Sequence, residues 1–155
     1  MSITINLDYK KIKIDGSVIE LINKYRQLNI EDCEAGGILV GRENKENGNL
    51  IIEYATQPYY KDKRTRVSFN RKDKKHIEFY NKLYKDNNAI YAYIGEWHTH
   101  PEDYPKYSCI DIRNWKKISK INEDKEKIYY HLIVGNKEIR IWEYKYNLKC
   151  AKRIY

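Results

Sequence analysis

Apolar residues at the start of the chain first alternate with polar ones and then recur at helical intervals. Residues 3–15 alternate loosely, which predicts one or two short strands. Ser17 and Glu20 have the spacing of a helix capping box, so a helix is expected to begin there and to continue to about Asn29. The residues that would place one face of this helix on the core are Val18, Ile19, Leu21, Ile22, Tyr25 and Leu28.

Two short apolar runs follow and predict a β-hairpin. The run at 36–41 is bounded by glycines, and the run at 50–56 comes after the turn signal at 46–48. A loop at 57–66 is then expected to lead into a short strand at 67–69.

Helices and strands alternate through the rest of the chain. A stripe of apolar residues predicts a second helix over 71–85, and the residues of this stripe are Ile77, Tyr80, Leu83 and Tyr84. The further expected elements are a strand at 89–100, a helix at 109–120, strands at 128–134 and 138–144, and an edge strand at 148–154. Helices that interrupt a mixed, mostly antiparallel sheet indicate an α+β fold, in which helices flank the sheet in an α/β sandwich.

The composition of the chain predicts one hydrophobic core and no membrane-spanning segment. With 155 residues, 41% of them apolar, residues 1–155 are expected to form a single domain. No apolar window approaches the ~20 residues of a membrane span, and a soluble, cytoplasmic protein is therefore expected. Cys33, Cys109 and Cys150 lack C-x-x-C spacing, so they are interpreted as reduced thiols.

Positive charge is concentrated in one segment of a chain whose net charge is +8. Between residues 61 and 75, only Asp62 and Asp73 oppose eight basic residues: Lys61, Lys63, Arg64, Arg66, Arg71, Lys72, Lys74 and Lys75. Such a segment can meet an acidic protein surface, nucleic acid or only solvent. Nucleic acid is the least favoured of these partners.

A pair of histidines at the end of the strand predicted at 89–100 has the spacing of metal ligands. His98 and His100 are two residues apart, and alternate side chains of a strand point to the same face. Both imidazoles can therefore converge on one ion. His131 is interpreted as a polar residue of the core or surface, and His76, on a helix among lysines, as solvated.

A carboxylate follows on the buried stripe of the helix predicted at 109–120. Ser108, Asp111, Trp115 and Ile118 share one side of this helix, and an unpaired buried carboxylate would cost several kcal/mol. A metal held together with the two histidines is one possible partner. The alternative is that Ser108 and Asp111 only cap the helix. Two imidazoles and one carboxylate would leave a fourth tetrahedral position open, which is typical of a catalytic zinc site.

These residues complete a known signature, because the chain from His98 to Asp111 reads H-x-H-P-x6-S-x-x-D. It resembles the JAMM (JAB/MPN-type) metallopeptidases. The resemblance implies an MPN/cytidine-deaminase-like fold, one Zn2+ per chain bound by His98, His100 and Asp111, and hydrolysis of the amide bond at the C-terminus of a ubiquitin-like protein. It also implies that Ser108 hydrogen-bonds the developing oxyanion.

The same resemblance assigns the proton transfers to an upstream glutamate. Glu34 precedes the glycine-bounded run at 36–41, and Gly36 and Gly37 permit a close approach of the backbone. Glu34 would deprotonate the attacking water and protonate the leaving amine. Glu96 has at most a supporting role, and Glu102 and Asp103 are expected to line the mouth of the site.

Within this family, the chain is most similar to the prokaryotic JAB isopeptidases of CBASS anti-phage systems. That similarity implies a protein substrate, either a ubiquitin-like modifier or a conjugated cGAS-like nucleotidyltransferase. Processing of a ubiquitin-like or sulfur-carrier precursor is an alternative. A non-catalytic MPN scaffold is disfavoured because every ligand is present, and nucleic-acid binding through residues 61–75 is a further alternative.

Overall fold

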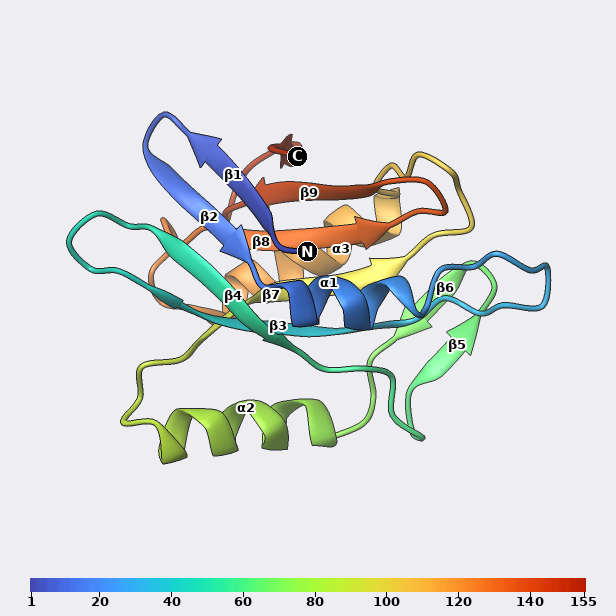
Figure 1. Ribbon diagram of the computed structural model, residues 1–155, viewed down its shortest axis with the longest axis horizontal. Coiled ribbons are helices and arrows are strands. Elements are labelled where there is room, and N and C mark those ends of the chain that lie inside the picture. Colours follow the sequence, from blue (N-terminus) through green and yellow to red (C-terminus); the bar gives the residue numbers. More distant parts are fainter.

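A curled eight-stranded sheet forms the centre of the computed structural model, which describes residues 1–155 (Figure 1). The strand order is β1-β2-β4-β3-β7-β8-β9-β10. The pairs β2–β4 and β7–β8 are parallel and the other pairs are antiparallel. The bounds of these strands are Ile3–Leu7 (β1), Lys10–Ile14 (β2), Gly36–Glu43 (β3), Leu50–Ala55 (β4), Ala92–Thr99 (β7), Tyr129–Val134 (β8), Ile139–Tyr144 (β9) and Lys152–Arg153 (β10).

Helices cover both faces of the sheet, which confirms the predicted α+β fold. Helix α1 (Gly16–Asn23) lies in front of the sheet in Figure 1, and α3 (Cys109–Ile121) lies behind it. Helix α2 (Lys75–Asp86) runs along the lower edge of the same view. The alternation of a strand explains this layering, because Leu39 packs in the same cluster as the α1 residues while Ile38 and Val40 pack with α2.

The centre of the sheet is the most deeply buried part of the molecule. All six residues of β8 are buried, as expected for a strand with helices on both sides. Strand β7 pairs with β8 on one side and with β3 on the other, where Gly36 lies opposite His98. The end of β7 is therefore held by two neighbouring strands.

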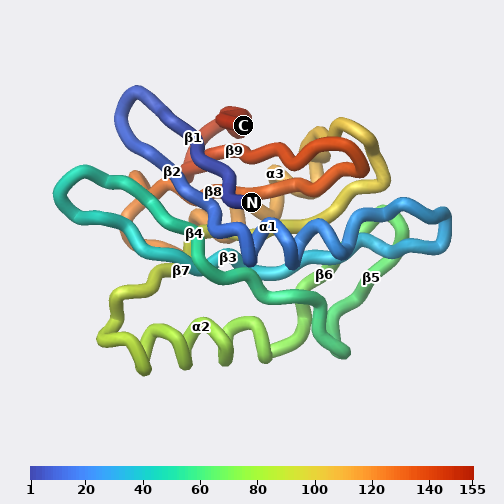
Figure 2. Tube along the Cα trace, viewed as in Figure 1, coloured from blue at the N-terminus to red at the C-terminus, as the bar shows by residue number.

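A separate two-stranded hairpin lies beside the large sheet, at the right in Figures 1 and 2. It consists of β5 (Lys63–Thr65) and β6 (Ser68–Asn70), and its turn contains Val67. The strand predicted at 67–69 agrees with β6 to within one residue, whereas β5 lies in the segment predicted as a loop, since a strand of three residues is too short to show alternation. Phe69 lies over Gly36, where an added Cβ would come within 2.5 Å of the phenyl ring.

Helix α1 differs from its prediction at both ends. Its N-cap is Asp15, so Ser17 lies inside the first turn and forms no capping box. The helix ends at Asn23, well before the predicted end at Asn29. The physical reason is a tertiary contact: the buried Gln27 side chain donates to the carbonyls of Asp32 and Arg66 and holds the following residues in a loop.

The other predicted helices and strands are present with shifted bounds. Helix α2 begins four residues later than predicted, and β7 begins at Ala92. The hairpin of β3 and β4, the helix α3 and the strands β8 and β9 agree with their predictions to within two residues. None of the helices is both long and apolar enough to cross a membrane.

Candidate metal centre

His98 and His100 converge at the end of β7, as their spacing predicted. Their Nε2 atoms lie 3.0 Å apart. The backbone around them is fixed on both sides, because the Thr99 N–H donates to the Ala35 carbonyl (2.8 Å) and the His100 N–H donates to the Val134 carbonyl (3.0 Å). The two rings are therefore positioned by the sheet itself.

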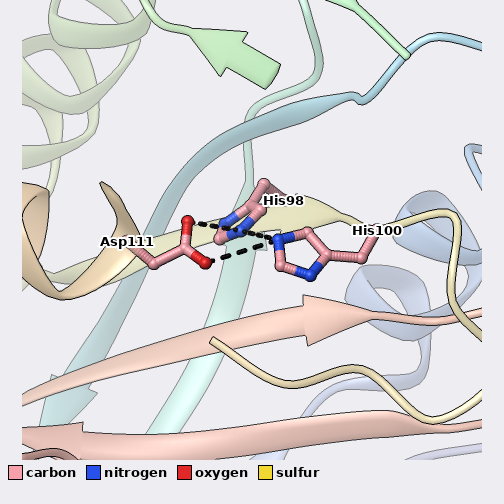
Figure 3. Close-up of side chains that lie close together, drawn as sticks. All are labelled: His98, His100 and Asp111. Carbon is pink, nitrogen blue, oxygen red and sulfur yellow. Dashed lines mark hydrogen bonds and ion pairs between the residues drawn. The ribbon is translucent and has the colours of Figure 1, made fainter. Parts of the chain in front are cut away.

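Asp111 of α3 faces both histidines (Figure 3). Its Oδ1 lies 3.1 Å from Nε2 of His98, and its Oδ2 lies 3.4 Å from Nε2 of His100. The helix is oriented by Trp115, one turn later, which is buried against Ile133 and Trp142. The side-chain stripe predicted from helical spacing is therefore the buried one, and it brings the carboxylate to the histidines.

Ser108 and Asp111 do form the helix cap that was the alternative interpretation of these residues. Ser108 Oγ accepts from the Asp111 N–H (3.1 Å), and the Ser108 N–H donates to Asp111 Oδ2 (2.6 Å), which completes a capping box. The Ser108 hydroxyl also lies 2.9 Å from the same carboxylate oxygen. The cap and the metal-ligand arrangement are compatible, because the cap fixes the orientation of the carboxylate.

The three side chains have the donor chemistry of a zinc site. One donor atom from each of His98, His100 and Asp111 lies within 4.8 Å of the others. Burial opposes ionisation of Asp111, but its bonds to His100 and His98 are stronger and hold its pKa well below the usual range. The same pairing raises the pKa of His98 against the effect of burial. An ionised carboxylate and two convergent imidazoles fit a divalent ion.

Glu34 lies next to this group and is buried, with only 5% of its surface exposed. Its Oε1 is 3.9 Å from Nε2 of His100. Burial raises the pKa of Glu34 to about 7, although His98 and His100 act in the opposite direction. A carboxyl group with this pKa can both accept and release a proton near neutral pH.

A cavity of about 280 Å3 opens beside these residues. One wall is the β5–β6 hairpin, with Val67, Ser68 and Phe69, and the opposite wall is α3, with Ile110 and Asn114. Neither wall was predicted as part of the site. The helical spacing could have indicated Ile110 and Asn114, which lie one and three residues from Asp111, and the short strand predicted at 67–69 contained no signal that it would reach the site.

The acidic residues near the signature have different surroundings. Glu96 lines the cavity and is bonded to Arg71 (2.9 Å) and to the Tyr93 hydroxyl (3.2 Å), which fits a supporting role. Glu102 also lines the cavity, with Oε1 3.7 Å from Nδ1 of His100. Asp103 pairs with Lys137 and contributes nothing to the cavity.

The interpretation of His76 as solvated is wrong, because this side chain is fully buried. Its Nε2 lies 2.7 Å from Asp62 Oδ2, and its Nδ1 lies 2.5 Å from Thr56 Oγ1. The loop that carries Asp62 folds over the first turn of α2 and removes His76 from water. Neighbouring lysines in the sequence could not indicate this tertiary contact.

His131 is a core residue, in agreement with one of the two interpretations given for it. It is fully buried and stacks on Trp115, with ring centroids 4.6 Å apart. Burial lowers its pKa to about 3, so the ring is neutral. The three cysteines are free, as predicted.

The three arginines of the basic segment at 61–75 form hydrogen bonds within the protein. Arg64 donates to the carbonyls of Cys33 and Glu34, Arg66 to those of Asn29 and Ile30, and Arg71 to Glu96. The five lysines of the segment are exposed. The lysine side chains are therefore available to present charge to a partner, whereas the charge of Arg71 is paired with Glu96.

Comparison with known proteins agrees with this architecture. Residues 26–145 match the family described as prokaryotic homologues of the JAB domain. The solution structure of protein DSY2949 from Desulfitobacterium hafniense has a TM-score of 0.61 at 16% identity, over 90% of this chain and 87% of that one. This likeness supports the fold alone.

Three relatives are each named CD-NTase/cGAS isopeptidase. The protein from Escherichia coli is 37% identical over 130 residues, which cover 84% of this chain and 80% of that protein. The protein from Pseudomonas aeruginosa is 34% identical, covering 81% and 77%. The protein from Vibrio cholerae is 32% identical, covering 82% and 78%.

Proposed function

This chain belongs to the family of prokaryotic JAB-domain homologues, and from that membership we propose that it is a zinc-dependent isopeptidase of CBASS antiviral defence. Its substrate is a protein to which a cGAS-like nucleotidyltransferase is joined through an amide bond. The relatives named CD-NTase/cGAS isopeptidase support this substrate. The observation that carries the proposal is the convergence of His98, His100 and Asp111 beside a separate, buried glutamate.

The three convergent side chains would hold one Zn2+ and leave a fourth position open toward the cavity. When bound, zinc supplies a Lewis acid and lowers the pKa of water to near neutrality. The pKa of Asp111 lies well below its usual range, so its carboxylate is ionised and available as a ligand at physiological pH. With zinc bound, the ion would replace the imidazole protons as the partner of this carboxylate. The two imidazoles would each use Nε2, which is the atom that faces Asp111.

Glu34 carries the proton transfers in this proposal. It lies outside the group of three donors, so it remains free to exchange a proton. With a pKa of about 7, it takes a proton from the attacking water and gives it to the leaving amine. Release of a protonated amine makes hydrolysis of the amide effectively irreversible at neutral pH.

Ser108 supplies a hydrogen bond to the developing oxyanion. Its oxygen already accepts the Asp111 N–H as part of the helix cap. A hydroxyl can accept and donate at the same time, so the cap leaves its proton available to the substrate. The donation to Asp111 Oδ2 would be exchanged for one to the oxyanion.

The cavity limits how the protein substrate can bind. At about 280 Å3, it has room for only a short stretch of extended chain. The folded parts of both conjugated proteins therefore stay outside, and the scissile bond must lie in a flexible tail. A C-terminal tail joined to a lysine side chain has this form.

The proposal is tested by incubating zinc-loaded protein with three substrates: a nucleotidyltransferase conjugated to a lysine of a target protein, the same tail in a linear fusion, and a sulfur-carrier precursor. We expect cleavage of the conjugate, and we expect none with Glu34→Gln protein that retains its zinc. Preference for the sulfur-carrier precursor would favour precursor processing instead. A zinc-loaded protein that binds the conjugate but cleaves no substrate would be a scaffold.

A further inference from the structure

We infer that Arg64 of β5 is a positioning residue for Glu34, which it holds through the backbone. The inference rests on the proposed function, because it concerns the group that moves protons there. In the sequence, Arg64 is one of the eight basic residues of the segment at 61–75. Its guanidinium does not contact the Glu34 carboxylate, and it donates instead to the main-chain carbonyls of Cys33 and Glu34, which lie on either side of the Glu34 Cα.

Three hydrogen bonds join β5 to the segment that carries Glu34. Arg64 Nε donates to the Glu34 carbonyl (2.7 Å), and Arg64 Nη2 donates to the Cys33 carbonyl (3.2 Å). In the opposite direction, the Glu34 N–H donates to the Thr65 carbonyl (2.8 Å). The peptide groups on both sides of the Glu34 Cα are thereby fixed, so the direction of its side chain is fixed as well.

The next residue is held by the strand that carries the histidines. The Ala35 N–H donates to Thr99 Oγ1 (2.9 Å), and the Ala35 carbonyl accepts from the Thr99 N–H (2.8 Å). Thr99 lies between His98 and His100. Glu34 is thus placed by two elements at once, β5 on one side and the end of β7 on the other.

Arg64 is itself held in place, and it lies on the hairpin that forms one wall of the cavity. Its guanidinium lies 5.9 Å from the centroid of the Tyr25 ring. The same hairpin presents Val67 and Phe69 to the cavity, and Arg71, which follows β6, bonds to Glu96 on β7. A substrate tail that contacts the hairpin therefore contacts the element that fixes Glu34.

This arrangement predicts an effect on turnover and not on binding. Without the guanidinium, the Cys33 and Glu34 carbonyls lose their hydrogen-bond donor. The cavity wall at Val67 and Phe69 and the three candidate metal ligands are not altered by this change. A displacement of about 1 Å of a reacting group can lower a rate by about 10²-fold. We expect Arg64→Ala to lower kcat by about 10-fold to 10²-fold, with KM changed less than about twofold and zinc content unchanged.

Arg66→Ala is the matched control. Arg66 lies two residues away in the same hairpin and also donates to two backbone carbonyls, those of Asn29 and Ile30, but it has no contact with Glu34. We expect its kcat to stay within about twofold of wild type. Arg64→Lys keeps the charge and can reach one carbonyl, so its kcat should lie between those of wild type and Arg64→Ala.

A second measurement separates this inference from the proposed function. Amide exchange at Glu34, followed by NMR, needs no substrate, and it should be faster in Arg64→Ala than in wild type or Arg66→Ala. Wild-type protein that cleaves no conjugate would overturn the proposed function, while faster exchange in Arg64→Ala alone would still support the positioning. Unchanged exchange, unchanged kcat, zinc loss in Arg64→Ala, or an equal loss of kcat in Arg66→Ala would overturn the role of Arg64.

Discussion

Two buried pairs of a histidine and an aspartate lie in different regions of this protein, and they differ in how their polar atoms are used. In the pair of His76 and Asp62, both ring nitrogens have protein partners, and Asp62 also accepts the backbone N–H groups of Tyr59, Lys72 and Asp73. In the pair of His98 and Asp111, the ring nitrogen that meets Asp111 also faces a second histidine and lies beside a cavity.

The difference shows that residue type and burial do not by themselves indicate a functional site. The His76 pair has every bonding position filled, which suits a structural contact between a loop and a helix. In the His98 pair, the donor atoms converge on one point, where they can bind a further partner such as an ion. Substitutions in the two pairs should therefore change different properties of the protein.

The largest effect is expected from loss of a metal ligand. His98→Ala, His100→Ala or Asp111→Ala each removes one of three donors, so zinc binding and conjugate cleavage should both be abolished. Elemental analysis and a cleavage assay measure the two properties. His76→Phe is the control from the other pair and should keep its zinc; protein that never binds zinc, even when zinc is supplied, would contradict the metal site.

Glu34→Gln should separate chemistry from metal binding. Glu34 is not one of the three donors, so zinc content and melting temperature should stay near wild type. Cleavage should fall by about 10²-fold to 10⁴-fold, the range for a positioned general base. If zinc loss were the main result, Glu34 would be a ligand and its assigned role would be wrong.

Ser108→Ala tests a residue with both a structural and a proposed catalytic role. Loss of the oxyanion donor should lower kcat by about 10² to 10³. Loss of the helix cap should lower the free energy of unfolding by about 1 kcal/mol. Chemical denaturation measures the second effect independently, and a stability loss without a kcat loss would leave Ser108 as a cap only.

His76→Phe should act on folding and leave the chemistry unchanged. It removes one of the two partners of Thr56 Oγ1, which still accepts from the Ile38 N–H, and one partner of Asp62. The loss of a buried hydrogen bond costs roughly 0.5–3 kcal/mol. The free energy of unfolding should fall accordingly, while kcat and zinc content per folded chain stay unchanged. A large loss of kcat in well-folded protein would contradict the structural role of the His76 pair.

The smallest effect is a pH dependence of stability that arises from Asp62. Burial opposes its ionisation, but the backbone N–H groups and His76 are stronger, so its pKa in the folded state is lowered. A lowered pKa stabilises the fold above the unfolded value, about 3.9, and this stabilisation is lost as pH falls toward the folded value. Unfolding curves at decreasing pH should show this loss, and Asp62→Asn should reduce it.

The convergence of the three candidate ligands was predictable because its signals are local. Strand alternation places His98 and His100 on one face, and helical spacing places Asp111 on the stripe with Trp115. The role of Glu34 came only from family resemblance, although its burial and raised pKa fit that role. The structure brings all four side chains together.

The features that the sequence did not predict depend on contacts between distant residues. Helix α1 ends early because Gln27 bonds to Arg66, which is 39 residues away. His76 is buried because a loop folds over it. Strand β5 is too short for a periodic pattern, and its hairpin with β6 is held by arginines that bond to carbonyls of another loop. No local pattern of apolar and polar residues contains such information.

The capping box at the start of α3 links ion affinity to helix formation. Asp111 Oδ2 accepts the Ser108 N–H as a cap, and the same carboxylate faces the two histidines. The first turn of α3 cannot fray without moving this carboxylate away from them. In a metal-binding protein of this geometry, affinity for the ion would therefore depend on the helix propensity of that turn. Cys109 sets this propensity in part, and its side chain is exposed and lies outside the group of three donors.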